Sequence, residues 1–199
     1  MTRRPGRTIR PFLTLDAIPS MPTLRHARLI ALLLLLIGPL GCRDAAPTEP
    51  LTDLTGFVPD GETHVMLQQL PGPTPGTLTF VVRVVTRLDG VASYQGEVTF
   101  TPDAFELLGT TTPPAADGEM YLLNAQGAQG RLRFSALTTE HFSTDEAFRF
   151  TVRPTRPVDQ AGLAASLAVV GNVDGTAVAA SRVRSADGIR DVKGRLVTK

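Results

Sequence analysis

The stretch Leu78-Thr-Phe-Val-Val-Arg-Val-Val-Thr86, followed by Asp89-Gly90 and then by Val91-Ala-Ser-Tyr-Gln-Gly-Glu-Val-Thr-Phe100, decides the fold of this 199-residue chain. In both runs, apolar side chains such as Phe80 and Val98 stand at every second position. A period of two places them on one face of an extended strand. Because Asp-Gly between two such runs favours a tight turn, we predict a β-hairpin here, with one buried face.

The same alternation recurs further along the chain, with Phe134 and Phe150 at the centres of two more runs. Asp-Gly pairs punctuate the chain, and Asn172-Val-Asp-Gly175 predicts another hairpin loop. Only residues 103–108 suggest a helical turn. One apolar and one polar face per strand is typical of antiparallel sheet. We therefore predict an all-β fold, an antiparallel β-sandwich or jelly roll of about nine strands. The predicted strands are 63–70, 77–88, 91–101, 119–124, 130–138, 146–153, 162–170, 176–184 and 189–197.

The N-terminal region has the order of a secretory signal. Arg25 and Arg28 precede the apolar run 29–41, and Cys42, the only cysteine of the chain, follows this run. The run is shorter than the roughly 20 residues that a transmembrane helix needs, and Pro39 would break such a helix. A short transmembrane anchor and an ordinary signal peptide with an incidental cysteine are the alternatives to a lipoprotein signal.

Gly41-Cys42 after this run resembles the lipobox of bacterial lipoproteins, although Pro39 stands where that family favours Leu. The resemblance implies that Cys42 is acylated and becomes the mature N-terminus. The residue after Cys42 is Arg43 and not Asp, which favours the outer membrane over retention in the inner one. We expect an exported protein, lipid-anchored to the cell envelope. Its parts are a leader at 1–41 with Met21 as the true start, a lipidated N-terminus and Pro-rich tether at 42–62, and a domain at 63–199.

Composition narrows the function of the part after the leader. From Cys42 onward, 14 Lys and Arg stand against 18 Asp and Glu, and an acidic domain is poorly suited to bind nucleic acid. A single cysteine excludes an internal disulfide. The chain has no tryptophan and two tyrosines, Tyr94 and Tyr121, of which Tyr94 falls on a predicted buried face. This scarcity of exposed aromatic rings counts against sugar stacking.

No residue pattern indicates catalysis or a cofactor. His64 and His141 are predicted to be surface residues, and no Gly-x-Ser-x-Gly motif accompanies them. No zinc spacing occurs, and the 172–175 loop lacks the ligand set of a calcium loop. The carboxylates Glu140, Asp145 and Glu146 predict a solvated loop and not a glycosidase pair. The arginines of the strands either solubilise the outer face of a sheet or form a polar binding surface; they are Arg83, Arg131, Arg133, Arg149 and Arg153.

Three stretches resemble cohesin domains: Val91–Leu108, in which Thr101-Pro102-Asp103 replaces the Asp-Pro turn of the family, Asn124–Phe134 and Glu146–Val152. The resemblance covers about residues 63–197. It implies a nine-stranded β-sandwich related to carbohydrate-binding modules, in which one sheet face holds a dockerin-type protein partner. We therefore expect a non-catalytic binding module. The alternatives are a carbohydrate-binding module of the same type and a structural envelope lipoprotein, and no ligand-binding residue is assigned.

Overall fold

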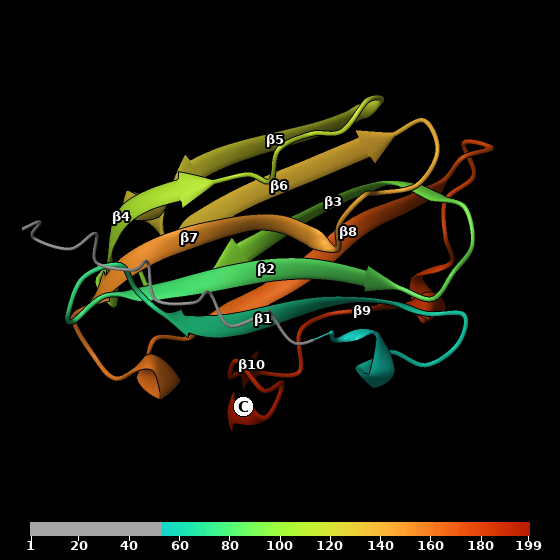
Figure 1. Cartoon of the computed structure of the whole chain (residues 1–199). Helices are drawn as coiled ribbons and strands as arrows, with labels where there is room; N and C mark the ends of the chain where they lie inside the picture. The colour runs from blue at the N-terminus through green and yellow to red at the C-terminus, as the bar shows by residue number, and fades with distance from the viewer. Residues whose placement is uncertain (1–52) are drawn as a thin grey trace, which may run out of the picture. The chain divides into compact units, whose positions relative to one another are not determined.

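The computed structural model describes residues 53–199. The predicted leader, Cys42 and most of the predicted tether lie outside these residues. Figure 1 shows that the strands form two sheets, packed face to face as a β-sandwich. Four one-turn 3₁₀ helices lie outside the strands within residues 53–199: η1 (Thr55–Phe57), η2 (Gly127–Gln129), η3 (Val158–Gln160) and η4 (Ala180–Arg182). No helix within 53–199 is long and apolar enough to cross a membrane.

The larger sheet has the order β11-β10-β1-β2-β7-β4, and β9 also pairs with β1. Its strands are β1 (Thr63–Pro71), β2 (Leu78–Thr86), β4 (Phe105–Thr111), β7 (Glu146–Pro154), β9 (Val183–Arg184), β10 (Ile189–Arg190) and β11 (Leu196–Thr198). The smaller sheet has the order β5-β6-β3-β8. Its strands are β3 (Val91–Thr99), β5 (Glu119–Gln126), β6 (Arg131–Thr138) and β8 (Ala164–Asn172).

The core lies between the two sheets and consists of the alternating apolar residues that the sequence identifies. Phe80 of β2 and Phe150 of β7 are fully buried, with ring centroids 5.2 Å apart. Phe134 of the smaller sheet meets Phe148 of the larger one, also at 5.2 Å. Tyr94 is buried, as predicted. Aromatic pairs at these separations add to the stabilisation from burial, so this layer holds the two sheets together.

The predicted hairpin between the two deciding runs is wrong. Residues 89–90 do form a turn, and Gly90 has a φ of 73°. However, β2 pairs with β1 and β7, whereas β3 pairs with β6 and β8 in the other sheet. The turn therefore carries the chain from one sheet to the other. The alternation of apolar and polar residues indicates which side of a strand is buried. It does not indicate in which of the two sheets the strand lies.

Three further predictions need correction. Residues 103–108 do not form a helical turn, because Phe105–Thr111 pairs with β7 along its length as the edge strand β4. The 172–175 loop makes the predicted turn, but after the bridge between Gly171 and Ala177 the chain leaves the sheet. The predicted strands 176–184 and 189–197 shrink to β9, β10 and β11. Residues 53–199 therefore form eleven strands instead of nine, and the pairs of β1 with β9 and β10 are parallel.

Candidate binding surface

The outer face of the larger sheet is covered over β1 and β2 by the protein's own residues. Leu54 and Val58, from the end of the predicted tether, are buried in a cluster with Met66 of β1 and Val85 of β2. Both residues of this predicted tether therefore pack on the domain. This part of the outer face therefore offers little surface to a partner.

A buried polar network extends this closed face. Arg83 of β2 is 6% exposed, and its Nη1 donates to both carboxylate oxygens of Asp145, at 2.5 and 2.7 Å. Its Nε donates to the side-chain oxygen of Gln68, which is fully buried. Charges leave water only when they are paired and hydrogen-bonded. The network is thus structural, which leaves Arg83 unavailable to a ligand.

Two predictions about these charged residues are therefore wrong. Arg83 is not on a wet face, because the side of β2 that carries it is covered. Of the loop predicted to be solvated, Glu140 is exposed, but Asp145 pairs with Arg83, and the buried Glu146 pairs with Arg149. A cluster of charges in the sequence does not reveal that one of them has an ion-pair partner on a distant strand.

The histidines do not form a catalytic constellation. His141 is exposed, as predicted, whereas His64 is half-buried. Its Nε2 lies 2.8 Å from a carboxylate oxygen of Glu62, and this hydrogen bond lowers the pKa of Glu62. Glu62 also pairs with Arg184 of β9. Among residues 53–199, no group of three or more His, Cys, Asp or Glu is placed to hold a metal ion.

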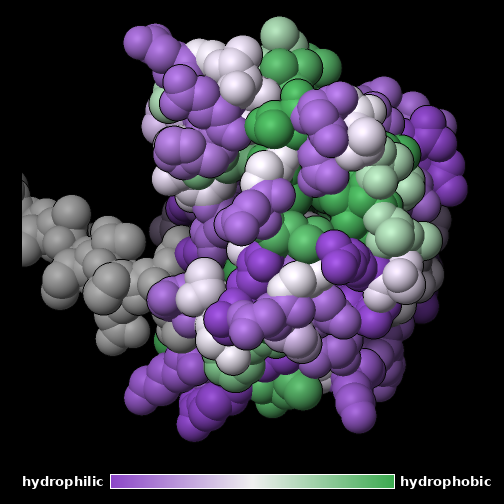
Figure 2. All heavy atoms as spheres, turned by 90° about the vertical axis from the view of Figure 1, so that its right-hand side faces the viewer, coloured by the Kyte–Doolittle hydropathy of each residue, from purple (hydrophilic) through white to green (hydrophobic). Residues whose placement is uncertain are grey.

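The outer face of the smaller sheet is open and carries exposed apolar side chains. Met120 and Leu122 of β5, Leu137 of β6 and Val169 of β8 are between 44% and 57% exposed. We call these four residues the apolar patch. Met120 lies directly across from Leu137, and Leu122 shares a cross-strand row with Val169 through Ser135 and Gln95. Figure 2 views the right-hand end of Figure 1 and shows hydrophobic side chains reaching the surface at the top, where β5 and β6 lie.

The other end of the same face is polar. The next row holds Asn124, Arg133, Glu97 and Ser166, and the row after it contains Arg131. Glu97 lies 3.5 Å from the Arg131 Nε and 3.9 Å from the Arg133 Nε, in pairs open to solvent. A shallow groove of 590 Å³ runs over Leu122 and Gln95 and over the polar row of Asn124, Arg133, Glu97 and Ser166. The face therefore combines an apolar end with a charged end, an arrangement that suits recognition of a protein surface.

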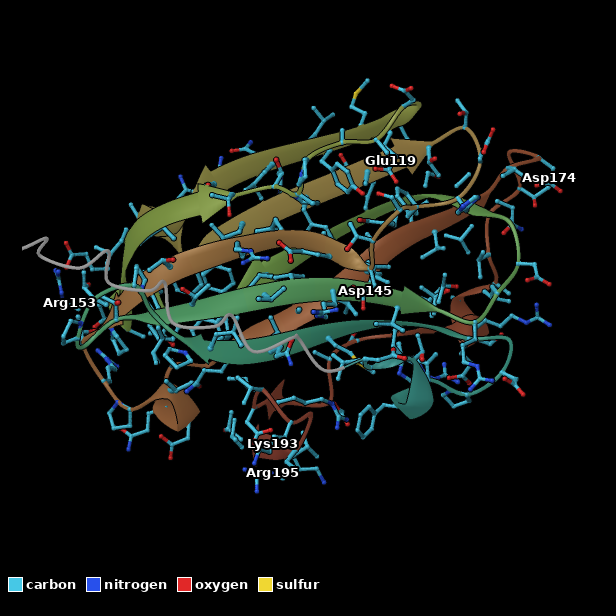
Figure 3. The ribbon with its side chains drawn as sticks, in the orientation of Figure 1. Glu119, Asp145, Arg153, Asp174, Lys193 and Arg195 are labelled. Carbon is cyan, nitrogen blue, oxygen red and sulfur yellow. The ribbon has the colours of Figure 1, made fainter. Side chains whose placement is uncertain are left out.

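A hydrogen-bonded loop supports the β5 edge of this face (Figure 3). Glu119 accepts hydrogen bonds from the backbone N–H and the hydroxyl of Ser143, the N–H of Ala116 and the Tyr121 hydroxyl. Burial acts to raise the pKa of Glu119, but these hydrogen bonds outweigh it, and the pKa lies below its usual value. Burial, with the nearby charge of Glu119, raises the pKa of Tyr121 to about 12. Phe142 packs its ring on Tyr94 and Tyr121.

Part of this surface is predictable from the sequence. Arg131 and Arg133 lie on it, as one of the two interpretations of the arginines requires, whereas Arg149 and Arg153 lie on the larger sheet. The apolar patch was missed. Its signal is present in Glu119-Met-Tyr-Leu-Leu123, in which apolar residues occupy both faces of the predicted strand. The predicted lipidation site, Cys42, lies outside the described residues.

Among known proteins, the comparisons found similarity to solved structures. No protein-family model matches the chain, and no curated protein matches it. Solved structures similar to it include cohesin modules. A non-cellulosomal cohesin from Archaeoglobus fulgidus is 14% identical, with a TM-score of 0.45 over 63% of this chain and 88% of that one. A type I cohesin–dockerin complex from Clostridium thermocellum gives 9% identity and a TM-score of 0.48, over 65% and 99%. The sixth cohesin of scaffoldin B from Acetivibrio cellulolyticus, in complex with a dockerin, gives 15% and 0.47, over 63% and 97%.

Proposed function

We propose that the protein is a non-catalytic module that binds a protein partner through the outer face of the smaller sheet. The observation that carries the proposal is the apolar patch. Met120, Leu122 and Leu137 lie together on β5 and β6, and Val169 stands across the same sheet face, beyond Ser135 and Gln95. On the larger sheet, by contrast, Leu54 and Val58 cover part of the outer face. Contiguous exposed apolar surface next to polar residues is a common mark of a protein interface.

The partner has an apolar stripe for Met120, Leu122 and Leu137, and polar groups for Arg131 and Arg133. A dockerin-type module is the first partner to test, because the resemblance of the sequence to cohesins implies one. The patch itself specifies an apolar protein surface and no particular family. Export and acylation of Cys42 complete the proposal, and hold the module on the cell envelope, at the outer membrane.

The test of binding is a pull-down from the source organism with the full chain, with and without calcium. Leu122→Asp places a charge in the apolar patch and should abolish capture of the specific partner. The matched control is Leu108→Asp on the edge strand β4, where the leucine is 42% exposed and lies outside the patch. Equal capture by both variants and the unchanged chain would overturn the proposal and favour a structural envelope role.

The test of anchoring is separate. Cells that express the full chain are fed a labelled fatty acid, and Cys42→Ser is the control. We expect label on the unchanged chain and none on Cys42→Ser. Label on both proteins, or on neither, contradicts acylation at Cys42.

The polar end of the groove favours a second candidate, carbohydrate binding. Gln95, Asn124 and Arg133 line this end of the groove and offer hydrogen-bonding groups to a sugar. Among residues 53–199, no ring offers a stacking platform there: Phe134 lines the groove but is buried, Tyr94 is buried too, and Tyr121 is engaged by Glu119. Affinity electrophoresis in soluble polysaccharides distinguishes the two candidate functions. If the module binds sugar, at least one polysaccharide retards the unchanged chain and does not retard an Asn124→Ala variant.

A further inference from the structure

We infer that the C-terminal end of the domain is a lipid-facing surface, which rests on the anionic headgroups of a bilayer. We call this surface the basic cap: it consists of Phe57, Lys193, Arg195, Leu196, Val197 and Lys199. The inference rests on the proposed anchoring through Cys42. It concerns a surface that is separate from the apolar patch, because the basic cap belongs to the edge of the larger sheet and the patch to the smaller sheet.

The first observation is a separation of charge along the chain. Residues 53–181 hold seven Lys and Arg against fourteen Asp and Glu, whereas residues 182–199 hold six against two. The domain is therefore acidic except for its last 18 residues. A basic end on an otherwise acidic domain directs that end, and not the remainder, toward an anionic surface.

The cations of the cap are available. Among residues 53–199, neither Lys193 nor Lys199 forms an ion pair, and the Arg195 side chain is 73% exposed although it pairs with Asp191 at 2.6 Å. In Figure 3, Lys193 and Arg195 project together from the lower edge of the domain. Their charges therefore face outward, where headgroup phosphates would meet them.

Exposed apolar side chains accompany these cations. Phe57 and Leu196 are each 46% exposed, and Val197 is 52% exposed. Leu196 and Val197 point to opposite faces of β11, which is the edge strand of the larger sheet. An edge-on approach to a bilayer thus brings both toward the interface. Apolar side chains among basic ones are the composition of surfaces that bind the interface of anionic membranes.

The residues of the basic cap are held together by contacts with η1, close to where the described chain begins. The Arg190 guanidinium lies 4.6 Å from the centroid of the Phe57 ring, and its Nη1 donates to the Gly194 carbonyl at 3.0 Å. A Cβ at Gly194 would come within 3.0 Å of the same ring and 3.4 Å of Leu54. The turn that carries Lys193 and Arg195 is therefore fixed against η1. Figure 1 shows η1, β10 and the C-terminus along the same lower edge.

The length of the chain between Cys42 and the domain limits how far the basic cap can lie from the bilayer. Asp53 is eleven residues after Cys42, a span of at most about 40 Å when fully extended. Because Leu54 is buried next to the cap, this short connection ends there. Attachment of Cys42 to a bilayer would hold the cap near the lipid and raise its effective concentration at the surface.

The experiment uses the full chain with Cys42→Ser, so that a single new cysteine carries a fluorophore. One chain is labelled at Val197→Cys in the cap, and the control at Leu108→Cys on the opposite edge strand β4. Both are bound to vesicles of phosphatidylcholine, with or without phosphatidylglycerol, that contain a lipid-attached quencher. The leader is the same in every chain, so its contribution to binding is constant.

We expect the label at position 197 to be quenched several times more than the label at 108 on vesicles with phosphatidylglycerol, and the difference to vanish in high salt. Lys193→Glu with Lys199→Glu should lower the fraction of cap-down molecules by at least about 25-fold, because loss of each cation costs about fivefold and the new carboxylates add repulsion. Neither residue is ion-paired among the described residues, so the fold is retained, which circular dichroism verifies.

Equal quenching at positions 197 and 108, or a difference that survives the two charge reversals, would overturn the inference. That outcome would leave acylation of Cys42 and binding through the apolar patch as they are. Conversely, an unacylated Cys42 would remove the proposed anchor without changing the quenching result, so the two failures are distinguishable.

Discussion

The two outer faces of this sandwich differ in how they are finished. On the larger sheet, Leu54 and Val58 cover Met66 and Val85, and the buried Arg83 is paired with Asp145. On the smaller sheet, the apolar patch faces solvent with nothing in residues 53–199 packed over it. The difference teaches that the chain uses its own N-terminal segment to complete one face. The face that it leaves open is the one that we propose binds a partner.

The largest effect should come from removing the cover of the closed face. Leu54 is fully buried, so Leu54→Ala leaves a cavity and should lower the free energy of unfolding by about 3 kcal/mol. Denaturant unfolding of the full chain measures this. A loss below about 1 kcal/mol, in the range of surface substitutions, would mean that the segment does not complete the sheet.

The next effect concerns the buried ion pair. Asp145→Asn leaves the Arg83 guanidinium buried beside a neutral group and should cost about 2 kcal/mol, less than a fully buried pair because the Asp145 side chain is 27% exposed. Glu97→Gln on the open face is the matched control. Its pairs with Arg131 and Arg133 are solvent-exposed, so it should cost at most about 0.5 kcal/mol. Equal losses would remove this distinction between the two faces.

Glu119, which supports the β5 edge of the open face, should make the stability of the fold depend on pH. The usual pKa of a glutamate is 4.5, and that of Glu119 lies lower in the folded protein. The stabilisation is therefore complete above pH 4.5 and is lost as the pH falls through the folded value. Glu119→Gln should cost about 1 kcal/mol at neutral pH and flatten the decline below pH 4.5. A variant with an unchanged acid limb in thermal unfolding would refute the role of this carboxylate.

The smallest effect on stability is expected in the apolar patch itself. Leu122 is 57% exposed, so Leu122→Ala should change the free energy of unfolding by no more than about 0.5 kcal/mol. Leu54→Ala and Leu122→Ala remove the same atoms. The difference between their losses of unfolding free energy therefore distinguishes a leucine that completes the fold from one that is free to bind. Denaturant unfolding of both variants under one set of conditions provides the comparison.

Much of the inner architecture follows from the sequence. Alternation in 78–86 and 91–100 identifies which side chains enter the core, and Tyr94 is buried as that pattern requires. The pattern does not reveal which strands become neighbours, because any strand with one apolar face fits either sheet. For that reason Asp89-Gly90 predicts a hairpin, whereas the structure uses the turn to change sheets. Residues 103–108 became a strand because β7 offers them backbone partners from far along the chain.

The functional surface was less predictable, for a related reason. Whether an outward-pointing residue is wet depends on segments that are distant in sequence. Arg83 and Leu122 both occupy outward positions, yet one is buried under the closed face and the other is exposed. A single strand cannot reveal this difference, although the apolar residues on both faces of 119–123 were a signal of it.

Photo-crosslinking tests the central claim most directly, namely that the open face and not the closed face holds a protein partner. A photoreactive residue is placed at Leu122 on the smaller sheet or, in a second chain, at Arg153, an exposed position on the outer side of the larger sheet (Figure 3). Both chains are expressed at full length in the source organism and illuminated. We expect one defined crosslinked partner from position 122 and none from position 153. The same partner crosslinked from position 153, with none from position 122, would contradict it.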